Sequence, residues 1–87
     1  MKLKYQFVIT SVADEVFAVP IESNGEFNGV IAINETMKDI IELLAVDRTE
    51  ENLAIAMLEK YKNVTEKEMK TSIHETCVRL KNDNLLA

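Results

Sequence analysis

The hydrophobic pattern of this 87-residue chain changes period once, at Asn34. Before that position, three runs rich in β-branched and aromatic residues are separated by short polar segments, at residues 5–10, 16–19 and 27–33. After it, apolar residues recur at the i, i+3, i+4 and i+7 spacing of helices. Because the connections are short, the sequence predicts an α+β fold: a three-stranded antiparallel β-meander followed by three α-helices.

Residue types that break strands separate the three runs. Residues 12–14 form a short polar break, and Pro20 closes the second run because it cannot donate a ladder hydrogen bond. Residues 22–26 contain Asn24-Gly25, which accepts positive φ at little cost and indicates a turn.

Capping residues mark the expected helix starts. Asn34 and Thr49 are suitable N-caps, and Thr65 with Glu68 forms a capping box. Asp47 and Arg48 are expected to end the first helix, and residues 85–86 to dock on the core. The expected inner faces are Met37, Ile40, Ile41 and Leu44; then Leu53, Ala56, Met57 and Tyr61; then Met69, Ile73, Thr76, Cys77 and Leu80.

Size and composition limit the function classes. One domain is expected, with residues 1–34 forming the sheet and residues 35–87 a three-helix bundle. One Cys and one His exclude an internal disulfide and a multi-Cys zinc site, and no nucleophile–base motif is visible, so neither enzyme activity nor a cofactor is expected. The net charge of −5 argues against nucleic acid as a partner. No run reaches the ~20 apolar residues of a membrane span and no signal peptide is visible, so a cytoplasmic location is expected.

The third run has the sequence of an unusual edge strand. It carries no charge from Asn28 through Asn34, and it is apolar on both faces, with Val30 and Ala32 on one side and Ile31 and Ile33 on the other. Edge strands are normally protected by charged residues or Pro. A free edge of this kind favours pairing with an extended peptide. The alternative is that the sheet curls and helices cover both of its faces.

The third helix carries a basic stripe formed by Lys67, Lys70, His74, Val78 and Lys81. This stripe is typical of one side of a binding cleft for a peptide that mixes acidic and aliphatic residues. It is equally typical of a helix flank that faces solvent. No second His and no Cys pattern near His74 could complete a metal site. Cys77 lies on the apolar stripe and is expected to be a small core residue. Glu35 and Asp39 are expected to interact with the helix dipole rather than to act as a catalytic pair.

Several of these stretches together resemble the PqqD family, the RiPP recognition element. The resemblance rests on FNGVIAINET at residues 27–36, IIELL at residues 40–44, Thr49-Glu50-Glu51, Tyr61 and the C-terminal Leu85-Leu86. Two positions depart from the family pattern: Ile41 stands where many members have Trp, and Asn84 stands where Gly is common. Ile is still a core residue, and Asn tolerates the left-handed conformation at a helix C-terminus.

The resemblance implies a winged-helix-like domain that is not itself catalytic. Such a domain binds the leader of a ribosomally made precursor peptide as an added strand and delivers it to a modifying enzyme, often a radical SAM protein. The implied peptide-binding residues are Asn28, Gly29, Val30, Ile31, Ala32 and Ile33 on the strand, and Lys70, His74, Cys77, Val78 and Lys81 on the helix. No metal or membrane partner is implied. A homodimerising scaffold and a winged-helix nucleic-acid-binding regulator remain as alternatives.

Overall fold

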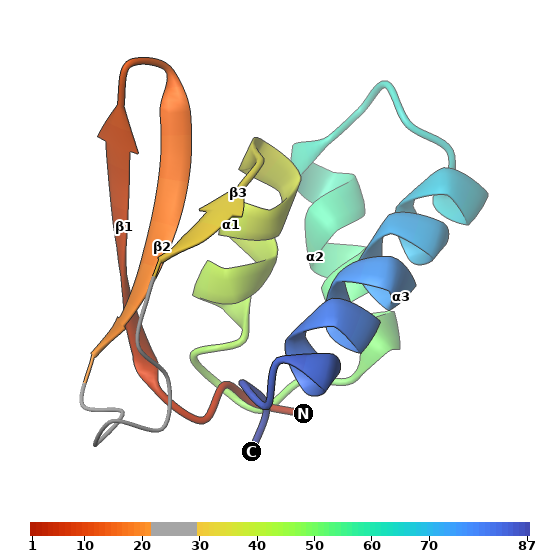
Figure 1. Ribbon diagram of the computed structural model, residues 1–87. Coiled ribbons are helices and arrows are strands. Elements are labelled where there is room, and N and C mark those ends of the chain that lie inside the picture. Colours follow the sequence, from red (N-terminus) through yellow and green to blue (C-terminus); the bar gives the residue numbers. More distant parts are fainter. Residues whose placement is uncertain (22–29) are drawn as a thin grey trace.

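The computed structural model describes residues 1–21 and 30–87, and it contains three strands followed by three helices (Figure 1). The strands form one antiparallel sheet in the order β1-β2-β3, which confirms the predicted α+β meander. The elements are β1 (Gln6–Val12), β2 (Glu15–Ile21), β3 (Ile31–Ile33), α1 (Glu35–Leu43), α2 (Glu50–Lys60) and α3 (Glu66–Asn82).

A two-residue turn joins β1 to β2 and fixes their register. Ala13 and Asp14 both have positive φ, 49° and 68°, which is the signature of a type I′ hairpin turn. In such a turn the flanking residues, here Val12 and Glu15, form a hydrogen-bonded pair. Hydrogen-bonded and non-hydrogen-bonded pairs then alternate along the ladder. The odd-numbered residues of β2 therefore bond to β1, and its even-numbered residues direct their backbone groups toward β3.

The strand boundaries differ from those predicted. β1 and β2 are both longer, and β2 continues through Pro20 to Ile21. Pro20 removes no bond from the β1–β2 ladder because its backbone nitrogen faces the β3 side, where the last described pair is Ala18↔Ile31. The expected turn at residues 22–26 and the first residues of the third run, including Asn28 and Gly29, lie outside the described residues.

The three predicted helix caps are confirmed. The side chains of Asn34 and Thr49 accept from the backbone N–H groups of Met37 and Asn52, and Thr65 forms a complete capping box with Glu68. α1 ends at Leu43, before the expected Asp47. No helix among the described residues combines the length and apolar composition needed to cross a membrane.

One apolar cluster joins the sheet to the helices, and it contains the predicted face of α1 together with Leu53, Met57 and the apolar side of α3. On α2 the fully buried alanine is Ala54, whereas the predicted Ala56 is half-buried. Leu85 is also buried, as expected, and the C-terminal segment pairs with the N-terminal one through a Leu3↔Leu86 bridge. The left-handed φ of 59° at Asn84 makes this return possible after α3.

A buried carboxylate ties α1 to the end of α2. Asp39 is only 4% exposed; it accepts a hydrogen bond from Tyr61 Oη, and its Oδ1 lies 2.7 Å from Lys60 Nζ. Burial raises the pKa of Asp39, but the hydrogen bonds from Lys60 and Tyr61 and the lysine charge outweigh it and hold the pKa below its usual value. The bond to Asp39, aided by burial, raises the pKa of Tyr61 to about 12.

The substitution Asp39→Asn tests this network through its pH dependence. The ionised carboxylate favours the folded state, so its contribution is complete above the unfolded pKa of 3.8 and is lost as the pH falls through the lower folded value. At pH 7 we expect the variant to lose about 1–3 kcal/mol of unfolding free energy, and the difference from wild type to shrink below about pH 4. Urea unfolding across pH measures both. The exposed control Glu59→Gln should differ little from wild type, and an equal loss at every pH in Asp39→Asn would contradict the assignment.

Candidate functional site

The outer edge of β3 has backbone groups that point away from the sheet. β3 is an edge strand, and no other strand of the described residues pairs with its outer side. Since the even-numbered residues of β2 face β3, the pairs Val16↔Ile33 and Ala18↔Ile31 are the hydrogen-bonded ones. Ala32, which lies opposite Phe17, therefore directs both its N–H and its C=O away from the sheet.

The two faces of this strand have different environments. Ile31 is 5% exposed and belongs to the core, and Ile33 packs against the core. Val30 is 60% exposed and Ala32 is also exposed, so helices do not cover both faces of the strand. The predicted apolar strand thus has one face in the core and the other at the surface.

One side chain of α3 reaches the edge of β3. Arg79 Nη2 lies 3.5 Å from the carbonyl oxygen of Ala32, a long hydrogen bond, and Nη1 lies 3.4 Å from the sulfur of Met37 in α1. The guanidinium therefore lies where the edge of β3, the first turn of α1 and the C-terminal half of α3 meet. This contact defines which flank of α3 faces the strand.

The predicted basic residues Lys70 and His74 lie on the other flank of α3. Arg79 follows Lys70 by nine positions, which places the two side chains about 180° apart around the helix axis. His74 Nδ1 is 3.1 Å from Glu50 Oε1 of α2, and Lys70 Nζ is 2.8 Å from Glu66 Oε1. Lys70 and His74 line a hollow of about 290 Å³ together with Glu50 and Glu51 of α2. They do not lie on the flank of α3 that reaches β3.

The remaining predicted wall residues divide between surface and core. Lys81 follows Lys70 by three helical turns and is exposed on the same flank. Val78 is exposed beside Arg79 in the sequence. Cys77 is a buried free thiol, as the core interpretation predicts, and burial raises its pKa to about 11.

Arg79 is the contact to β3 that the sequence analysis missed. It belongs to a stripe with Ser72 and Thr76 at i, i+4 and i+7, on the opposite side of the apolar face from Lys70. The one sequence signal for this flank was the prediction that Thr76, three residues before Arg79, faces inward, and the structure shows Thr76 half-buried.

The side chains of Cys77 and Asp39 are both buried. The raised pKa of Cys77 keeps its thiol protonated near neutral pH, and a buried thiol of this kind is inert. Asp39 is bonded to Lys60 and Tyr61. Among residues 1–21 and 30–87, no group of three or more His, Cys, Asp or Glu side chains is arranged to hold a metal ion.

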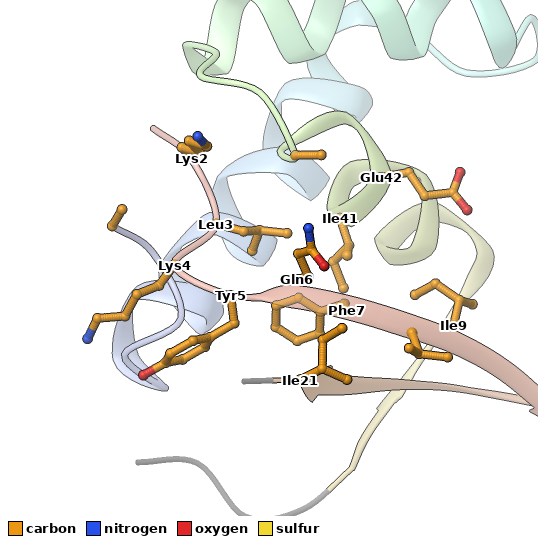
Figure 2. Close-up of a pocket in the computed structure, with 13 residues that line it drawn as sticks. Lys2, Leu3, Lys4, Tyr5, Gln6, Phe7, Ile9, Ile21, Ile41 and Glu42 are labelled. Carbon is orange, nitrogen blue, oxygen red and sulfur yellow. The ribbon is translucent and has the colours of Figure 1, made fainter. Parts of the chain in front are cut away.

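A second hollow, of about 840 Å³, lies along the first residues of the chain and β1. Figure 2 shows Leu3 and Ile41 pointing into the space between the N-terminal segment and α1, with the Lys4 side chain directed away from it. β1 and β3 are opposite edges of the sheet, so this hollow is separate from the edge on which Ala32 lies.

Comparison with solved structures finds the same fold in TbiB1, solved in complex with the TbiA(beta) leader peptide. The TM-score is 0.70 at 20% sequence identity, and the alignment covers 99% of this chain and 94% of that one. No family model matches the chain. No curated protein matches it either. The comparison therefore establishes a shared fold over nearly the whole length.

The environments of Val30 and Ile31 predict opposite effects of the same substitution. Ile31→Asp places a charge in the core and should cost about 3 kcal/mol or more of unfolding free energy. Val30→Asp changes an exposed side chain and should cost no more than about 0.5 kcal/mol. Urea denaturation followed by circular dichroism measures both. Equal stability of the two variants would contradict the placement of Ile31 in the core.

Proposed function

We propose that this chain is a non-catalytic peptide-binding module that recognises the leader of a ribosomally synthesised precursor peptide. The leader adds as a strand to the outer edge of β3, on the side where α3 provides a wall. The bound precursor is then presented to a modifying enzyme. The resemblance to the PqqD family favours a radical SAM protein as that enzyme.

The observation that carries this proposal is the outward direction of the Ala32 backbone on an uncharged edge strand. Strand addition draws its affinity from main-chain hydrogen bonds and its specificity from alternating side chains. Ala32 supplies an N–H and a C=O, and exposed Val30 supplies an apolar contact next to them. Natural edges normally carry a charge or a bulge, and β3 carries no charged residue.

The shared fold supports the same proposal from an independent direction. TbiB1 has been solved with a leader peptide bound, and this chain matches it over nearly the whole length of both. The PqqD-like stretches at residues 27–36 and 40–44 point to the same class of ligand. A fold by itself does not determine function, so the transfer of leader binding to this chain is part of the proposal.

The side chains of the described residues fit a binding role better than a catalytic one. Cys77 is buried with a raised pKa, and Asp39 serves the contact between α1 and α2. A free thiol also suits the reducing cytoplasm, which remains our predicted location.

A second copy of the chain is the alternative occupant of the same edge. Two β3 strands could pair across a two-fold axis, because an uncharged edge does not repel itself. Sedimentation velocity distinguishes the two possibilities by measuring the oligomeric state. A chain that stays monomeric at all concentrations does not pair its β3 edge with a second copy.

A titration tests the proposed function directly. We expect a leader peptide, taken from a precursor encoded beside this gene, to shift the amide NMR signals of Val30, Ala32 and Arg79. Val30→Asp should weaken binding about tenfold, because it places a charge beside the added strand. The matched control is Val8→Asp, on the exposed face of the opposite edge strand, and it should leave the affinity unchanged. Signal changes confined to β1 and its hollow would reject the proposal.

A further inference from the structure

Arg79 contacts the backbone group of β3 that a leader strand would need. In the free protein its guanidinium reaches the outward carbonyl oxygen of Ala32 from α3. An added strand would donate its own N–H to that oxygen, at the shorter distance of a ladder hydrogen bond. Peptide binding would therefore take the Ala32 carbonyl from Arg79 and leave the guanidinium beside the peptide.

No ion pair within the described residues includes Arg79. Lys60 is bonded to Asp39, Lys70 to Glu66, and His74 Nδ1 lies 3.1 Å from Glu50 Oε1, whereas Lys67 and Lys81 of α3, like Arg79, have no ion pair within the described residues. The contacts of Arg79 are instead a carbonyl oxygen and a thioether sulfur, both weaker acceptors than a carboxylate. A displaced guanidinium in this position would favour a carboxylate from the ligand.

The pleat of the sheet indicates which ligand side chain can reach Arg79. The peptide residue opposite Ala32 points to the solvent side, as Ala32 does. Its two neighbours point to the side of Ile31 and Ile33, where the helices pack. Arg79 comes from α3 and contacts Met37, so its guanidinium lies toward the helical side of the strand.

We infer that Arg79 is a specificity-determining residue that selects leaders with an Asp or Glu next to the residue paired with Ala32. This inference rests on the proposed function and adds the chemical class of the ligand. The fork of the guanidinium can bind both oxygens of a carboxylate, which a lysine cannot do. The basic stripe at Lys70 and Lys81, on the other flank of α3, has no part in this selection.

The test uses a displayed library of random linear peptides, selected separately on the wild-type chain, on Arg79→Met and on the control Lys81→Met. Met keeps the length of the aliphatic stem, and both residues are exposed, so both variants should fold. We expect wild type and Lys81→Met to enrich one acidic position, and Arg79→Met to lose that enrichment. Replacing the enriched acid by its amide in a selected peptide should weaken binding to wild type about tenfold and leave binding to Arg79→Met unchanged.

Amide NMR of the complexes separates the two proposals. Selected peptides that shift Ile31, Ala32 and Ile33 but show no acidic preference overturn the role of Arg79 and leave the proposed function intact. Tighter binding to Arg79→Met than to wild type also overturns it, because Arg79 would then only compete for the Ala32 carbonyl. A selection that yields no peptide acting at β3 overturns the proposed function, and the role of Arg79 with it.

Discussion

The parity of the β-ladder is the constraint on which the candidate site depends. The type I′ turn at Ala13 and Asp14 makes Val12 and Glu15 a hydrogen-bonded pair. Because hydrogen-bonded and non-hydrogen-bonded pairs alternate, this pair determines which residues of β2 bond to β3, and the backbone of Ala32 is left facing outward. A slip of one residue would invert every side chain and turn Ile31 to solvent. Burial of Ile31 in the core therefore fixes the same register that exposes the edge.

The helical layer completes this arrangement by covering one face of the sheet and stopping short of its edge. Apolar side chains of α1 and α3 join β2 and β3 in one cluster, and the buried Asp39 ties α1 to the end of α2. The result is a helix, α3, whose two flanks meet different neighbours. Lys70 and His74 line a hollow with the start of α2, whereas Arg79 reaches the edge of β3. An edge strand whose outer side pairs with no other described strand, beside a helix flank, is the geometry that the proposed strand addition uses.

Much of this fold could be predicted from the sequence because its signals are local. The caps at Asn34, Thr49 and Thr65 start the helices where expected, since each side chain satisfies a nearby backbone N–H. The β1–β2 turn was recognisable only as a break, because Ala13-Asp14 lacks the Asn-Gly signature of a type I′ turn. The strand lengths were underestimated because pairing with β1 extends β2 through Pro20, and such pairing is not visible in the local sequence.

The rotation of α3 could not be predicted because it depends on tertiary packing. Periodicity identifies the apolar stripe, but the sequence does not say which neighbour lies beyond each flank. The basic stripe at Lys70 and Lys81 was therefore expected to face β3, whereas Arg79 makes that contact. Thr76 was grouped with the core although it is only half-buried, between the core and the Arg79 flank.

Amide hydrogen exchange, read residue by residue in the ligand-free protein by NMR, tests the open edge most directly. The N–H groups of Ile31 and Ile33 face β2, so they should be protected by the ladder. The N–H of Ala32, between them, faces outward and should exchange with solvent much faster than either. Equal protection of all three amides would mean that the edge is already paired, and the site proposed for the leader would not exist.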